Sequence, residues 1–164
     1  MTATYQKFFI LNAIITLIIV ISSFTFEFYY DLIPCKICLI QRYMWVLVFI
    51  SFMLAVFKLA NKKVISLISI IILFLLSLIA LYHSAIEYGL VKNIFSCTTT
   101  SGLDATSIEE LSNIILNTEN NDCAFPKFSF YGITLSNLSF ATSLILLLLN
   151  LQVLKKILFN NYES

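Results

Sequence analysis

The stretch that decides the architecture of this chain reads Pro34-Cys35-Lys36-Ile37-Cys38-Leu39-Ile40-Gln41-Arg42. Two cysteines at this spacing can close a reversible disulfide, and they stand where a short polar turn runs into a long apolar segment. Because residues three and four apart on a helix share a face, Cys35, Cys38 and Arg42 are expected on one face. An ionisable residue inside an apolar segment is costly and marks a functional site by default. We therefore predict that an electron acceptor is held beside Cys38.

The composition around this stretch is that of a membrane protein. Of the 164 residues, 60% are hydrophobic and 12% are charged, whereas soluble domains have about 45–50% apolar and about 25% charged residues. The mean hydropathy is +0.94. The sequence has no basic block suited to nucleic acid and no Gly-rich phosphate-binding loop. We expect a lipid bilayer as the surroundings and no nucleic acid as a partner.

Four apolar segments are each long enough for the ~17–25 residues of a spanning helix. They cover residues 8–26, 35–57, 64–86 and 128–154. The first exceeds the ~7–15 residues of a signal-peptide core, so we expect it to be retained. The predicted fold class is all-α: a polytopic membrane protein that forms one domain over 1–164, with a four-helix transmembrane bundle and a long outer loop over 87–127. Nothing in the sequence demands an oligomer, and we expect a monomer.

Lysine and arginine residues near the span ends predict the orientation. Six lie on the side of the two termini and the turn between the second and third spans, and four lie on the other side. Cytoplasmic segments carry the excess, so both termini are expected in the cytoplasm. With four spans, all four cysteines then emerge on the outer face, where disulfides persist.

The long loop contains one predicted short helix. The segment 106–110 (Thr-Ser-Ile-Glu-Glu) offers a capping box, and apolar residues follow at helical spacing. This amphipathic helix either lies on the membrane surface or packs on top of the bundle. Cys97 and Cys123 stand in the polar flanks of the loop, where we expect them to be accessible.

Four cysteines allow three pairings, of which Cys35 with Cys38 and Cys97 with Cys123 is the most economical. A bridge between Cys35 and Cys38 constrains little chain, whereas structural bridges gain from long loops. A helix start also favours the thiolate form, so redox chemistry is favoured over a structural bridge. A zinc site is a further alternative. Closed structural zinc sites usually have two tight cysteine pairs and here only one pair is tight, so we expect no metal.

His83 is the only histidine of the chain. It lies near the outer end of the third predicted span, at the membrane depth of Cys38 and Arg42, and a ligand contact and an ordinary interfacial role fit it about equally. Glu87, one turn further on, either orients His83 or is solvated. Gln41 fits packing or a lipid-interface position as well as ligand binding.

Together these motifs resemble the bacterial disulfide bond formation protein B family (DsbB, including its DsbI-like branch), over nearly the whole chain. The resemblance rests on the quoted P-C-x-x-C-x-x-Q-R segment and on two others. These are Tyr82-His83-Ser84-Ala85-Ile86-Glu87-Tyr88-Gly89, and Cys123-Ala124-Phe125-Pro126 followed by Phe130-Tyr131-Gly132-Ile133-Thr134-Leu135-Ser136.

The resemblance implies an enzyme of the bacterial inner membrane, a quinone-dependent thiol oxidase that reoxidises a periplasmic DsbA-like thioredoxin-fold oxidase. The cysteines would be its catalytic residues and would lie in the periplasm. Cys97 would be attacked by the reduced partner, Cys123 would then engage Cys35, and Cys38 would face a membrane quinone. The quinone would be ubiquinone or menaquinone, an exchangeable cofactor. The quinone-binding residues implied are Arg42, His83 and Gln41.

Two other functions stay open at this point. One is a non-enzymatic tetraspan scaffold with two structural disulfides. The other is a quinone reductase that resembles vitamin K epoxide reductase homologues, although their C-x-x-C lies near the last span. The short linker between the first two spans leaves open whether the partner oxidase is general or dedicated.

Overall fold

A computed structural model describes residues 3–30, 34–59, 61–92, 129–130 and 132–159 of the chain. In these ranges the long helices are α1 (Ala3–Tyr30), α2 (Lys36–Val56), α3 (Lys62–Glu87) and α5 (Leu135–Phe159). All four are long and apolar enough to cross a membrane. The predicted four-helix membrane fold is therefore confirmed. The predicted loop helix, Cys97 and Cys123 lie outside the described residues.

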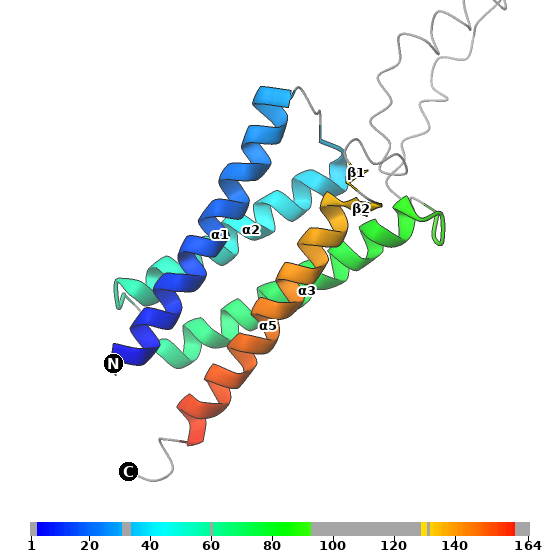
Figure 1. The fold of residues 1–164 in the computed structure, drawn as a ribbon. Coiled ribbons are helices and arrows are strands. Elements are labelled where there is room, and N and C mark those ends of the chain that lie inside the picture. Colours follow the sequence, from blue (N-terminus) through cyan, green and yellow to red (C-terminus); the bar gives the residue numbers. More distant parts are fainter. Residues whose placement is uncertain (1–2, 31–33, 60, 93–128, 131, 160–164) are drawn as a thin grey trace, which may run out of the picture.

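The four helices form a bundle in which α2 packs between α1 and α3, and α3 packs in turn against α5. The start of α1, the α2–α3 turn and the end of α5 lie at one end of the bundle (Figure 1). The start of α2, the end of α3 and the start of α5 lie at the other end. The C-x-x-C pair and His83 therefore share one end, as predicted. The side of the membrane that this end faces stays a prediction.

The bundle interior combines large apolar side chains with small polar ones. Phe9, Phe52 and Leu73 are fully buried. Ser51 on α2 and Ser69 on α3 hydrogen-bond through their hydroxyls at 2.9 Å. Small hydroxyl residues allow spanning helices to approach closely and bond across the interface. The outer surface also carries many exposed Leu, Ile and Phe side chains, as expected where lipid rather than water surrounds the helices.

The first helix is longer than predicted. The predicted span ended at residue 26 and assigned the next acid to a linker, but α1 continues to Tyr30. Glu27 is thus a helical residue, and it forms an ion pair with Arg42 of α2. The Glu27 carboxylate thus has a cationic partner at its depth in the membrane. This ion pair explains why α1 continues past the first charged residue of the predicted linker.

The fourth helix is displaced along the chain from the predicted 128–154. Strands β1 (Ser129–Phe130) and β2 (Ile133–Thr134) pair in antiparallel register before it. Gly132 lies between them at φ +79°, a conformation that favours glycine. Thr134 Oγ1 then accepts the backbone N–H of Asn137 at 3.3 Å, which is the bond of an N-terminal cap. The helix therefore begins at Leu135, and its far end continues to Phe159.

The second and third helices lie within two residues of their predicted bounds. Between them, Lys58 adopts φ 56°, and the Leu59 amide donates to the carbonyl of Leu54 at 3.1 Å. Asn61 caps α3 by accepting the amide of Lys63 at 3.1 Å. The basic turn predicted between these two spans is thus a tight connection with ordinary helix caps.

Candidate active site

Cys35 is the N-cap residue of α2, and its sulfur accepts the backbone N–H of Cys38 at 3.4 Å. The Cys35 thiol donates to Cys38 Sγ at 3.1 Å, and no disulfide joins the two residues. The amide groups at a helix N-terminus favour negative charge nearby. In this arrangement that effect acts most directly on Cys35, whereas Cys38 lies one turn inside the helix and is the less buried of the two.

His83 on α3 faces both sulfurs. Its Nε2 lies 3.7 Å from Cys35 Sγ and 3.9 Å from Cys38 Sγ, and the residue is 3% exposed. The expectation that His83 shares a membrane depth with the pair becomes a direct contact in the structure. The imidazole is therefore placed to exchange a proton with either thiol or to stabilise a thiolate.

Gln41 holds the other side of the imidazole ring. Its Nε2 lies 3.1 Å from His83 Nδ1, and the side chain is buried. As the amide is placed, Gln41 donates to Nδ1, so the hydrogen of a neutral ring resides on Nε2 and points toward the sulfurs. Packing, a lipid-interface position and ligand binding were the roles considered for Gln41 from sequence. The structure adds another, which is to orient His83.

Glu87 lies one helical turn beyond His83, with Oε1 3.6 Å from His83 Nε2. Its other oxygen accepts hydrogen bonds from Thr134 Oγ1 at 2.6 Å and from the Ser136 hydroxyl. Ser136 is also within 3.1 Å of Ser84 Oγ. The sequence left two roles for Glu87, orienting His83 or being solvated. The geometry favours the orienting role, since the carboxylate is buried and accepts a hydrogen bond from Ser136 of α5.

Arg42 is directed toward α1. Its Nε donates to Ser23 Oγ at 2.9 Å, its Nη2 donates to the Ser23 carbonyl at 3.2 Å, and its Nη1 pairs with Glu27. The guanidinium carbon lies 4.7 Å from the centroid of the Phe24 ring. The arginine therefore has a partner within the bundle. Its predicted quinone-binding role stays a prediction.

Apolar side chains surround the thiols. Cys35 packs with Ile37 and Ile86 in one buried cluster, against which Ile79 and Tyr82 also pack. Charges and hydrogen bonds interact more strongly in such low-dielectric surroundings than in water. A positive charge on His83 will therefore interact strongly with a thiolate on either cysteine.

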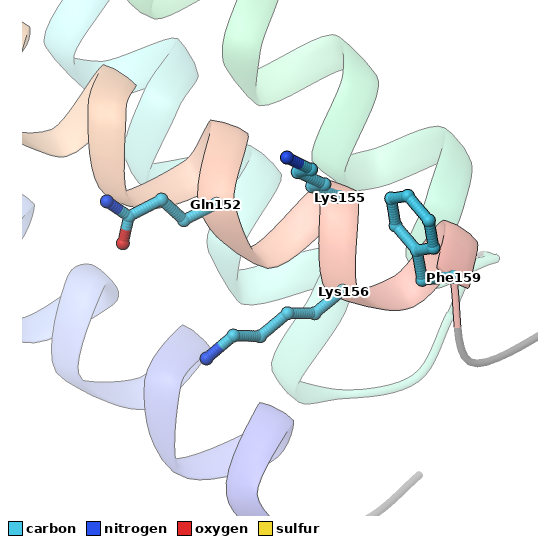
Figure 2. Close-up of a pocket in the computed structure, with 4 residues that line it drawn as sticks. All are labelled: Gln152, Lys155, Lys156 and Phe159. Carbon is cyan, nitrogen blue, oxygen red and sulfur yellow. The ribbon is translucent and has the colours of Figure 1, made fainter.

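A pocket lies at the opposite end of the bundle and takes no part in this site. It is lined by residues of the last turns of α5: Gln152, Lys155, Lys156 and Phe159 (Figure 2). Lys155 Nζ lies 5.9 Å from the centroid of the Phe159 ring. The thiols are at the other end of the helices (Figure 1), so this pocket is not where an electron acceptor would meet them.

Sequence reasoning missed two sets of polar residues in this region. Ser23 and Glu27 are four apart, which is the spacing of one helix face, but the predicted helix ended before Glu27. Thr134 and Ser136 stood within the quoted resemblance without an assigned role. Both sets matter because they supply hydrogen bonds to charged groups from a neighbouring helix or strand.

Comparison with known proteins was informative at the level of the family. Residues 5–153 match the sequence model of a family described as "Disulfide bond formation protein DsbB". No curated protein and no solved structure gave a match. The matched range includes the C-x-x-C pair, Gln41, Arg42, His83 and Glu87.

Proposed function

The chain belongs to the disulfide bond formation protein DsbB family, and from this premise we propose that it is a quinone-reducing thiol oxidase. It is a multi-pass membrane protein of a family that acts in disulfide bond formation. The proposed reaction reoxidises a DsbA-like thioredoxin-fold partner in the periplasm and passes the electrons to a membrane quinone. The observation that carries the proposal is the contact of His83 with both sulfurs of the Cys35–Cys38 pair in an apolar setting.

The first part of the proposed relay is thiol–disulfide exchange. A thiolate of the reduced partner attacks Cys97 in a Cys97–Cys123 bridge, and the partner leaves as a disulfide once its second thiolate has displaced Cys97. Cys123 then attacks Cys35 in a Cys35–Cys38 bridge, and closure of the Cys97–Cys123 bridge releases Cys35 and Cys38 as a dithiol. Each exchange breaks one sulfur–sulfur bond and forms another. The resemblance to the family supports the steps through Cys97 and Cys123.

The second part removes two electrons from the Cys35–Cys38 dithiol. A bound quinone would accept these two electrons and the two thiol protons. The imidazole beside Cys38 supports this step, because the hydrogen on His83 Nε2 is of the donor type that quinone carbonyl oxygens accept. The role of Arg42 at the quinone rests on the resemblance to the family. The apolar cluster around the thiols fits a lipid-soluble ring.

His83 holds and moves protons in this proposal. A positively charged imidazole between the two sulfurs would stabilise a thiolate on either residue. Glu87 would offset the charge on the ring, and Gln41 would keep the Nε2 edge toward the sulfurs, with its amide turned so that Oε1 accepts the Nδ1 hydrogen of the charged ring. Such a placed acid–base group contributes about 10²–10⁴-fold to rate in enzymes.

The experiment follows the redox state of a reduced DsbA-like partner mixed with purified protein and quinone. The unaltered chain should oxidise the partner and form an equal amount of quinol. Cys38→Ser should limit partner oxidation to the one equivalent that the Cys97–Cys123 bridge supplies and should stop quinol formation, whereas Tyr43→Phe should leave both unchanged, because the Tyr43 side chain is exposed on the outer face of α2. Continued oxidation of the partner by the Cys38→Ser protein would contradict the proposal.

A quinone extraction separates this proposal from a structural role of the cysteines. The oxidase predicts quinone that copurifies with the protein and cysteines that mild reductant opens. A scaffold with two structural bridges predicts cysteines that resist the same reductant and no bound quinone.

A further inference from the structure

Cys35, Cys38 and His83 place three metal-ligating atoms together. Their sulfur and nitrogen atoms all lie within 4.8 Å of one another. The expectation of no metal from sequence considered the four cysteines and counted only one tight pair. It did not include His83, which comes from the next helix and supplies the third ligand atom from within 3.9 Å of both sulfurs.

The spacing is close to that of a zinc centre. With Zn–S near 2.3 Å and Zn–N near 2.0–2.1 Å, tetrahedral geometry puts ligand sulfur and nitrogen about 3.5 Å apart and two sulfurs about 3.8 Å apart. The sulfur–nitrogen separations here are 3.7 and 3.9 Å, and the sulfur–sulfur separation is 3.1 Å. A small outward rotation of the Cys38 side chain, which is the less buried of the two, would open the space that a cation needs.

Charge also favours a divalent cation at this point. Two thiolates balance the charge of one divalent ion, so the occupied site is neutral, and a neutral site is tolerated in apolar surroundings where a lone charge is not. The carboxylate of Glu87, 3.6 Å from His83 Nε2, is stabilised separately by hydrogen bonds from Thr134 and Ser136. Thiolate and imidazole are the ligands that select zinc and other soft divalent ions over calcium and magnesium.

We propose that the reduced Cys35–Cys38 pair and His83 Nε2 form a binding site for a thiophilic divalent cation, represented by Zn²⁺. Binding displaces the two thiol protons and moves no electrons. The hydrogen of the neutral imidazole shifts from Nε2 to Nδ1, where the Gln41 amide turns to accept it through Oε1. The sulfurs stay reduced, and they form a disulfide only after the ion has left. A bound ion would therefore hold the pair in the dithiolate state and block its oxidation. The inference does not depend on the identity of the partner or of the electron acceptor.

The test uses the full chain in lipid nanodiscs with Cys97→Ser and Cys123→Ser, so that only one cysteine pair remains. The reduced protein is titrated with Co²⁺ and separately with Zn²⁺, and bound metal is measured after desalting. We expect about one ion per chain and, with Co²⁺, the absorption of thiolate ligation. We expect binding to be lost when the Cys35–Cys38 disulfide is formed in the same protein. This control requires no further substitution.

Two variants identify the ligands. His83→Ala should lower the affinity at least about tenfold, as loss of a metal-binding group does, with its helical circular dichroism spectrum unchanged. The matched control is Cys35→Ser with Cys38→Ser in a chain that keeps Cys97 and Cys123, which should bind no ion at this affinity. Absence of binding to the reduced pair, equal binding to the oxidised pair, or unchanged affinity in His83→Ala would each overturn the proposal.

Discussion

On each side of helix α2 a basic residue lies beside a carboxylate, and the two pairs differ in the contacts that they make. On the side of α1, Arg42 is bonded by Ser23 and Glu27 and covered by Phe24. On the side of α3, His83 faces Glu87 at 3.6 Å and two sulfurs at 3.7 and 3.9 Å. In the first arrangement, Arg42 makes direct hydrogen bonds to its partners. In the second, the imidazole makes longer contacts with a carboxylate and with two thiols, which lose their protons in thiol chemistry.

This difference suggests a division of roles. We propose that the Arg42 side fixes α1 against α2 and keeps a cation at the depth of the thiols, and that the His83 side holds and moves protons. Substitutions on the α3 side should therefore act mainly on the rate of thiol oxidation, whereas substitutions on the α1 side should act mainly on stability and on quinone use.

The largest effect on rate is expected for His83→Ala. Loss of a positioned acid–base group should reduce oxidation of the Cys35–Cys38 dithiol about 10²–10⁴-fold. The rate of quinol formation from prereduced protein measures this directly. The variant should also unfold at a lower temperature, because it leaves a cavity and an unpaired Gln41 amide, so the rate is measured well below its unfolding temperature. A rate within about twofold of the original would remove His83 from the proton path.

A smaller effect on rate is expected for Glu87→Gln. The amide keeps the shape of the side chain but removes the charge that would offset a protonated His83, and a hydrogen bond to a charged group contributes about 1.5–3 kcal/mol. We expect turnover to fall about tenfold or more, since about 1.4 kcal/mol corresponds to a factor of ten. Thr134→Val is the comparison, since it removes one hydrogen bond to the carboxylate and retains the charge. It should have the weaker effect if the charge is what matters.

On the α1 side, Arg42→Met should destabilise the protein and weaken quinone use. Removing the partner leaves Glu27 unpaired, but Glu27 is partly exposed, so we expect a loss of about 1–2 kcal/mol, less than for a fully buried pair. Glu27→Gln in the Arg42→Met background should restore much of the stability and none of the quinone affinity. A double-mutant cycle on unfolding free energy and on KM for quinone separates the two effects. Strictly additive stability changes would show that the ion pair contributes nothing.

The smallest effect is expected for Gln41→Leu. It removes one hydrogen bond to the imidazole in a buried position and retains the packing volume, which corresponds to about 1 kcal/mol. The rate of dithiol oxidation should fall severalfold, and Gln41→Glu should not restore it, because an ionised carboxylate accepts hydrogen bonds and cannot donate to Nδ1. The initial rate of quinol formation at saturating quinone measures both variants.

Much of the fold was predictable because long apolar segments of the required length have few alternatives to spanning helices. The errors occurred where contacts between distant residues decide a boundary. The end of α1 depends on Glu27 meeting Arg42, and the start of α5 depends on the turn at Gly132 and the cap at Thr134. A local hydropathy reading contains none of these pairings.

The residues that form the candidate site were easier to predict than the contacts between their side chains. Helix parity put His83 and the C-x-x-C pair at one end of the bundle, which the structure confirms. Spacing on α2 alone placed Arg42 with the thiols, but the contacts show that Arg42 faces α1 while the sulfurs face α3. The burial of Glu87 could not be foreseen, since its partners Thr134 and Ser136 are 47 and 49 residues away in the chain.

The most direct test of the central claim needs neither the partner nor the loop cysteines. Protein with Cys97→Ser and Cys123→Ser is reduced, freed of reductant, and mixed anaerobically with ubiquinone or menaquinone, and its thiols are counted by alkylation and mass spectrometry. The account predicts that Cys35 and Cys38 both become protected from alkylation while an equal amount of quinol forms. Thiols that stay fully alkylated in the presence of either quinone would contradict it.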